Sequence, residues 1–98
     1  MARFNELINT SQPVLVDFFS EGSEPCEKML PVLAEIAANV GDKARIIKVD
    51  VGKNPMTAGA YGIRAVPTIL VFKKGEIQWR QSGLIPAHRL LDILSILT

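Results

Sequence analysis

Cys26 is the only cysteine of this chain, and the residues around it could support thiol chemistry. It follows Pro25 directly and stands three residues after Ser23, so the local motif is S-x-P-C. We expect a helix to begin at Pro25, where unpaired backbone amides and the helix dipole favour a thiolate. The alternative is that Cys26 is a small buried apolar residue. Ser23 can cap the helix, but its hydroxyl cannot exchange disulfides, because that reaction requires a thiolate.

Asp17 is a second candidate, because it interrupts the apolar run VLVDFF of residues 14–19. Burying a carboxylate costs several kcal/mol unless the group is protonated or paired. Asp17 could therefore be a group that transfers protons, or it could face a polar gap in the structure. Lys48 lies in the next apolar run, and on its own it would be interpreted as a solvent-facing strand lysine.

Length and composition indicate one globular domain, residues 1–98, with enough apolar residues to form a single core. The formal net charge of +1, with acids and bases mixed along the chain, favours neither nucleic acid nor a membrane surface as a partner. A single cysteine excludes an internal disulfide and suits a reducing compartment. The N-terminal residues contain no apolar signal core, and no run approaches the roughly 20 apolar residues of a membrane span. We therefore expect a cytoplasmic protein.

The hydrophobic pattern predicts helices and strands that alternate along the chain. Continuous apolarity marks 14–19 as a central strand, Gly41 is the expected end of the helix that starts at Pro25, and Asn54 is the expected cap of the next helix. The expected elements are a helix at about 2–9, a strand at 14–19, a helix at 25–40, a strand at 45–51, a short helix from 55 to about 61, a hairpin of strands 68–72 and 76–80, and a helix after Pro86 with Leu90, Leu91, Leu94 and Leu97 inward. This order predicts a parallel strand pair followed by an antiparallel hairpin, with helices on both faces of the sheet.

The segment V-L-V-D-F-F-S-E-G-S-E-P-C-E-K-M-L-P, residues 14–31, resembles the strand, active-site loop and helix of thioredoxins, with serine in the place of the attacking cysteine. The resemblance covers essentially the whole chain. It implies an α/β thioredoxin-like fold with a central four-stranded mixed sheet flanked by helices. The family's first strand has no expected counterpart, because the sequence begins too late to supply it.

The resemblance implies a role for each candidate residue of the active site. Ser23 occupies the position of the nucleophile, and Cys26 that of the shielded resolving cysteine. Asp17 matches the buried aspartate that accepts the proton of the resolving cysteine, and Lys48 matches the lysine that modulates it. Pro67 matches a cis-proline, and the backbone before it pairs with an extended substrate segment in the manner of an added strand.

The resemblance also implies a binding surface for a substrate around the motif. The implied substrate-binding residues are Gly22, Glu24, Pro25, Val66, Gly83 and Leu84. Three positions depart from the family pattern. Thioredoxins have tryptophan where this chain has Gly22, glycine where it has Glu24, and usually tryptophan where it has Phe19. The loops at Val66 and at Gly83-Leu84 keep the family pattern, so the binding surface is better preserved than the chemistry at Ser23.

The implied function is thiol–disulfide exchange on protein disulfides, which Ser23 should impair or abolish in this chain. The alternative is a native, non-catalytic module that binds extended peptides or proteins. Ser23 itself could be a native capping serine or a deliberate replacement of cysteine, and the sequence leaves both open. The implied partners are disulfide-containing proteins and a thioredoxin reductase, with no cofactor. A monomer is expected, with a dimer linked through Cys26 as the alternative, and the lone His88 suggests no metal site.

Glu21, Glu24 and Glu27 surround the motif, with Lys28 as the only base nearby in the sequence. Glutamates at the start of a helix complement its dipole and stabilise it by tenths of a kcal/mol each. A functional interpretation is that they form an acidic rim that disfavours a thiolate at Cys26 and selects basic partners.

Overall fold

A four-stranded mixed sheet, in the order β2-β1-β3-β4, forms the centre of the protein. The computed structural model describes residues 2–98. Strand β1 (Val14–Phe19) pairs in parallel with β2 (Arg45–Asp50) and antiparallel with β3 (Thr68–Lys73), which in turn pairs antiparallel with β4 (Glu76–Ser82). This arrangement confirms the four-stranded mixed sheet expected from the sequence.

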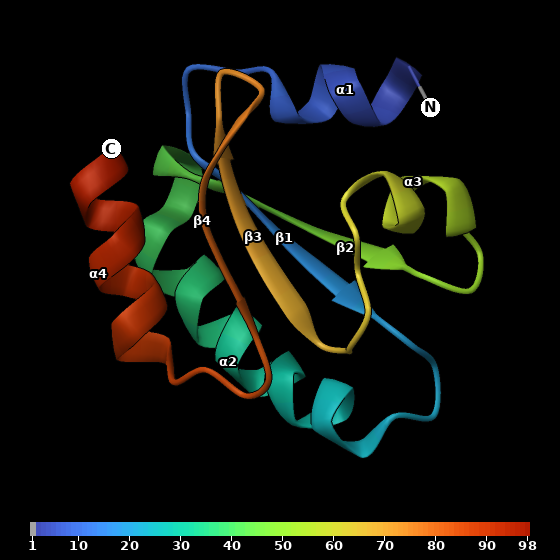
Figure 1. Cartoon of the computed structure of the whole chain (residues 1–98). Coiled ribbons are helices and arrows are strands. Elements are labelled where there is room, and N and C mark those ends of the chain that lie inside the picture. The colour runs from blue at the N-terminus through green and yellow to red at the C-terminus, as the bar shows by residue number, and fades with distance from the viewer. Residues whose placement is uncertain (1) are drawn as a thin grey trace.

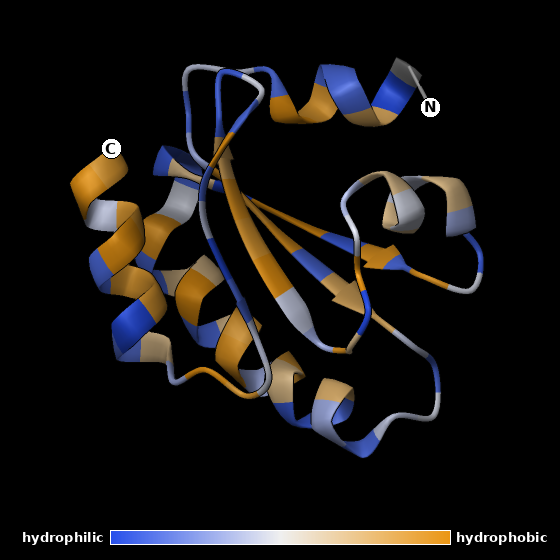
Figure 2. Cartoon of the chain, in the orientation of Figure 1, coloured by the Kyte–Doolittle hydropathy of each residue, from blue (hydrophilic) through white to orange (hydrophobic). Residues whose placement is uncertain are grey.

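Helices cover both faces of the sheet (Figure 1). Helices α2 (Glu24–Val40) and α4 (Ala87–Leu97) pack on one face, and α1 (Ala2–Ile8) and α3 (Pro55–Ala60) lie on the other. A short 3-10 turn, Gly41–Lys43, follows α2. Figure 2 shows the apolar residues concentrated on the inner strands and on the inward sides of the helices.

Alternation along β1 decides on which face Asp17 lies, because successive strand side chains point to opposite sides of a sheet. Leu15 belongs to the core under α2 and α4, whereas Val16 and Phe18 belong to the core under α1 and α3. Asp17 therefore faces the same side as Leu15, the side that α2 covers. The strand thus delivers a carboxyl group to the space beneath the start of that helix.

Most element boundaries agree with the sequence pattern to within one or two residues. Strand β4 continues to Ser82, two residues past the expected end, and β2 ends at Asp50. Asn54 is the N-cap residue of α3 and Pro55 lies in the first turn, as expected, but the Asn54 side chain makes no capping bond and its amide donates to the Asp50 carbonyl at 3.0 Å. Of the four leucines expected inward on α4, two are fully buried and Leu91 and Leu97 are half-buried.

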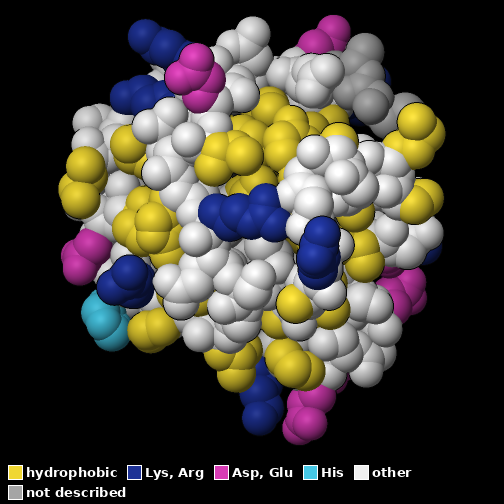
Figure 3. Space-filling model, in the orientation of Figure 1, with side chains coloured by type: hydrophobic (Ala, Val, Ile, Leu, Met, Phe, Trp, Pro, Cys, Tyr) yellow, Lys and Arg dark blue, Asp and Glu magenta, His cyan; other side chains and the backbone are white. Residues whose placement is uncertain are grey.

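The surface has no dominant charge on the face seen in Figure 3, where acidic and basic side chains are scattered singly among apolar and polar ones. Within residues 2–98, no helix is long and apolar enough to cross a membrane.

Candidate active site

Helix α2 places Cys26 in its first turn and Ser23 immediately before it. The Ser23 hydroxyl accepts a hydrogen bond from the Cys26 backbone N–H at 3.4 Å, so the expected capping role of the serine is confirmed. The Cys26 side chain is buried, with 4% of the residue exposed, whereas Ser23 is partly exposed. Ser23 is therefore the more exposed residue of the pair, and Cys26 is the one shielded from solvent.

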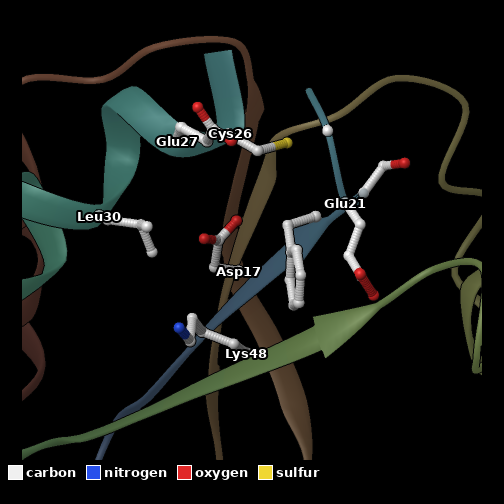
Figure 4. A pocket seen from close by; sticks show the side chains of 9 residues that line it. Asp17, Glu21, Cys26, Glu27, Leu30 and Lys48 are labelled. Atoms are coloured by element: carbon white, nitrogen blue, oxygen red, sulfur yellow. The ribbon is translucent and has the colours of Figure 1, made fainter. Parts of the chain in front are cut away.

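Asp17 lies below this turn with a carboxyl group that has no hydrogen-bond partner. The residue is 1% exposed, and neither of its two carboxyl oxygens is bonded within the described part of the chain. Burial raises the pKa of Asp17 from 3.8 to about 6, against a smaller lowering by the positive charge of Lys48. Figure 4 shows the carboxyl group between Cys26 and Lys48.

Lys48 is brought to Asp17 by strand register, since the two residues are direct partners across the parallel pair β1 and β2. The lysine ammonium nevertheless forms no ion pair within 4 Å of that carboxylate among residues 2–98, and it lies 5.9 Å from the centroid of the Phe19 ring. Its influence on Asp17 is therefore that of a nearby charge rather than of a bonded partner.

A cavity of about 290 Å³ opens over these groups. It is lined by Asp17, Phe19, Ser20, Glu21, Gly22, Cys26, Glu27, Leu30 and Lys48. Sequence reasoning did not assign Leu30 to the site, although it lies one helical turn after Cys26 and so shares its face of α2. Ser20 was missed as well, because its place in the cavity depends on the path of the loop after β1.

Gly22 leaves the mouth of this cavity open. Its φ of +79° is a conformation that residues with side chains rarely adopt. A Cβ placed on it would meet no heavy atom within 4 Å. The structure therefore has empty space where the family pattern has a tryptophan side chain.

The expected peptide-binding rim lies on the loops before β3 and after β4. The Val66–Pro67 peptide bond is cis, as the resemblance implied. The Pro67 carbonyl accepts a hydrogen bond from the Gly83 N–H at 2.8 Å, which joins the two loops. Val66 is half-buried and Leu84 is 51% exposed, so an apolar side chain is available beside the rim.

The three glutamates around the motif differ in their surroundings. Glu21 forms an ion pair with Lys53 at 3.6 Å, and Glu24 forms one with Lys28 at 3.9 Å. Lys28 is therefore not the only base near the motif, since Lys53 reaches it from the loop after β2. Glu21 and Glu27 line the cavity, whereas Glu24 lies outside it with a side chain that is 81% exposed.

Metal-binding side chains do not gather in the part of the chain that the structure describes, where no three His, Cys, Asp or Glu residues are placed to share an ion. His88 is exposed at the start of α4. The titratable residues that line the cavity are Cys26, Asp17, Lys48, Glu21 and Glu27.

Comparisons with proteins of known family show which family has this architecture. The thioredoxin family model matches residues 1–95. This chain belongs to the thioredoxin family. It is 40% identical over 88 residues to thioredoxin of Rickettsia prowazekii (strain Madrid E), an alignment that covers 90% of this chain and 84% of the relative. It is also 40% identical over 90 residues to chloroplastic thioredoxin Y of Oryza sativa subsp. japonica, which covers 91% of this chain and 54% of that one.

Among solved structures, chloroplastic thioredoxin z is similar to this chain, with a TM-score of 0.88 over 98% of this chain and 88% of its own. Its sequence identity of 24% makes this similarity a statement about the fold. Thioredoxins as a family are thiol–disulfide oxidoreductases, and the fold and the family expected from the sequence are thereby confirmed.

Proposed function

We propose that this chain carries the site of a thioredoxin-type oxidoreductase for protein disulfides, and that Ser23 prevents it from completing the two-cysteine cycle. The observation that carries the proposal is the buried carboxyl group of Asp17, which has no hydrogen-bond partner and lies beneath Cys26. A folded protein rarely leaves such a group unsatisfied without a functional reason. Proton transfer to and from Cys26 supplies that reason.

The cycle that the site supports requires a thiolate at position 23. That thiolate would attack a substrate disulfide, bond to one sulfur and release the other as a thiolate. Cys26 would then give its proton to Asp17 and attack the sulfur at position 23. The second substrate thiolate would leave and take up a proton, and a disulfide between positions 23 and 26 would remain. Because Ser23 has no sulfur, the first bond cannot form and the remaining steps have no starting point.

Asp17 is suited to the role of base in that cycle. Its pKa of about 6 lies near neutral pH, where a group can both accept and return a proton. Burial places the pKa there, and the charge of Lys48 keeps it from rising further. The pairing of β1 with β2 thus places Lys48 where its charge lowers the pKa of Asp17.

A second function, binding of extended peptides without redox chemistry, is favoured by the rim. The loop at the cis Val66–Pro67 bond is joined to Gly83, and the mouth at Gly22 is open. Pairing of a peptide with exposed backbone requires no cysteine. The chain could therefore bind its targets even though Ser23 blocks the exchange.

Replacing Ser23 with cysteine separates the two functions. With dithiothreitol as electron donor, we expect Ser23→Cys to accelerate the reduction of a disulfide-bonded test protein. The unmodified chain and the matched control Ser23→Ala should not exceed the uncatalysed rate. A Ser23→Cys protein that is folded but no faster than that background would contradict the relay, and peptide binding by the same protein would then support the second function.

The remaining expectations concern the surroundings of the protein and stay predictions. A thioredoxin reductase is the proposed source of electrons for a form with two cysteines, and disulfide-containing proteins are its proposed targets. The lone thiol suits a reducing compartment such as the cytoplasm. The burial of Cys26 argues for a monomer rather than a dimer linked through this residue.

A further inference from the structure

We infer that the cavity over Asp17 is a specificity subsite that receives one basic side chain, arginine or lysine, of a bound extended peptide. The inference rests on the proposed function in one respect, because it requires a peptide to run along the rim at Val66 and Gly83. It goes further by naming the class of residue that the peptide must carry.

The floor of the subsite is the carboxyl group of Asp17. It is 1% exposed, it points into the cavity, and both of its oxygens lack a hydrogen-bond donor within residues 2–98. A guanidinium or ammonium group would bring several donors into this space, and hydrogen bonds to charged partners are among the stronger ones. The unsatisfied acceptors and the donors of a basic side chain are therefore complementary.

The charge of the walls favours the same ligand. Glu21 and Glu27 line the cavity together with Asp17, against the single cation Lys48. The carboxylate of Glu21 is shared with Lys53, but Glu27 has no ion-pair partner within 4 Å among the described residues. The Lys48 ammonium lies over the Phe19 ring and not on Asp17. An acidic excess therefore remains for an incoming cation.

Size and shape favour a single side chain over a free small molecule. The volume of about 290 Å³ is at the lower limit of the roughly 300–1,000 Å³ typical of ligand pockets. Phe19 and Leu30 form apolar walls on which the methylene stem of a long basic side chain can pack. Gly22, which lines the cavity, has no side chain, and a Cβ added to it would meet no described heavy atom within 4 Å, so the cavity has space for entry on this side.

The proposed peptide path passes this entrance. Ser20 lines the cavity and also lines a second hollow beside Val66, so the two hollows are neighbours on either side of this residue. A peptide paired with the backbone at Val66 can therefore place one side chain in the cavity. Asp17 and Glu27 are therefore the residues that confer selectivity, whereas Glu24 does not, because it lies outside the cavity and pairs with Lys28.

The test uses the unmodified protein and end-capped heptapeptides of alanine, serine and valine in which each position in turn holds arginine. Each peptide has a matched control with citrulline, which keeps the shape of arginine but is neutral. We expect one register in which the arginine peptide binds about tenfold more tightly than its citrulline control, because hydrogen bonds between charged partners are stronger than those made by a neutral donor. The carbon resonance of the Asp17 carboxyl group should shift with that peptide and not with its control.

Two protein variants show which glutamate is responsible for the preference for arginine over citrulline peptides. Glu27→Gln should reduce the ratio of the two affinities about two- to threefold, as expected for the loss of one exposed charge. Glu24→Gln, on the same helical turn but outside the cavity, should leave the ratio unchanged. Equal affinities for arginine and citrulline peptides in every register, with backbone resonances of Val66 and Gly83 perturbed by both, would overturn the subsite and leave the proposed peptide rim standing. No binding by any of the peptides would overturn the rim and the subsite together.

Discussion

Asp17 and Lys48 are direct partners across the parallel strands β1 and β2, yet no hydrogen bond joins their side chains. The carboxyl group of Asp17 is buried, whereas the lysine is exposed and lies over the Phe19 ring. The charge of Lys48 acts on Asp17 through space and offsets only part of the effect of burial, so the pKa of Asp17 remains raised. This incomplete compensation destabilises the folded protein at neutral pH and gives Asp17 a useful proton affinity.

Asp17→Asn should stabilise the protein above pH 6. The pKa of Asp17 is about 6 in the folded chain and 3.8 in the reference state, so the folded state holds the proton across this window. The free energy of unfolding must therefore fall as the pH rises from about 4 to above 6. Above this range, ionisation of the buried Asp17 lowers the stability of the folded protein by about 3 kcal/mol. We expect the variant to gain roughly 1–3 kcal/mol at pH 8 and little at pH 4.

Urea unfolding of both proteins between pH 4 and pH 8 measures this difference. Glu24→Gln is the matched control, because it also removes one carboxylate but at an exposed position. A gain for Asp17→Asn that is the same at every pH would show that the ionisation of Asp17 is not the cause.

Lys48→Met should raise the pKa of Asp17 above its value in the unmodified chain, because it removes the positive charge that lowers this pKa. A titration of the Asp17 carboxyl resonance measures the shift directly. Lys28→Met serves as the control, since Lys28 pairs with Glu24 outside the cavity and should leave the Asp17 titration in place. An unchanged or lower pKa in Lys48→Met would refute the modulating role of this lysine.

Much of the fold and of the site could be predicted because it depends on local patterns of apolar, turn and capping residues in the sequence. The apolar pattern and the turn residues located the α-helices and strands, although not the 3-10 turn Gly41–Lys43. Asp17 required an explanation because it interrupts the continuous apolar run 14–19. The position of Cys26 in a first helical turn followed from Pro25 and the capping serine. Each of these features depends on residues that are close together in the sequence, so the sequence alone is enough to predict it.

The features that could not be predicted depend on contacts between distant segments. The ion pair of Glu21 with Lys53 joins the loop after β1 to the loop after β2, and no local pattern indicates it. Asn54 is the N-cap residue that the sequence indicated, but its side-chain amide donates to the Asp50 carbonyl and its side chain makes no capping bond, which the sequence did not indicate. The membership of Leu30 in the cavity became visible only once α2 was placed over β1.

Ser23→Ala should destabilise the protein modestly through loss of the helix cap. Replacing a capping serine by alanine typically costs about 0.5–2 kcal/mol. The bond from the Cys26 N–H to the Ser23 hydroxyl is long at 3.4 Å. We therefore expect a loss in the lower half of that range, about 0.5–1 kcal/mol.

Urea unfolding at pH 7 measures the loss, and Ser23→Asn, which can cap a helix equally well, is the control that should retain the stability of the unmodified chain. A loss of the same size in both variants would mean that the hydroxyl does not act as a cap.

Cys26 should react slowly with iodoacetamide in the folded protein and quickly in the unfolded chain. The residue is 4% exposed beneath the loop at Ser23, so the reagent must wait for an opening of the start of α2. We expect the rate at pH 7.5 to rise at least tenfold in concentrated urea, after correction for the effect of urea on a free cysteine peptide. Equal corrected rates in the folded and unfolded states would show that the thiol is open to solvent, and Cys26 could then not be the shielded member of the pair.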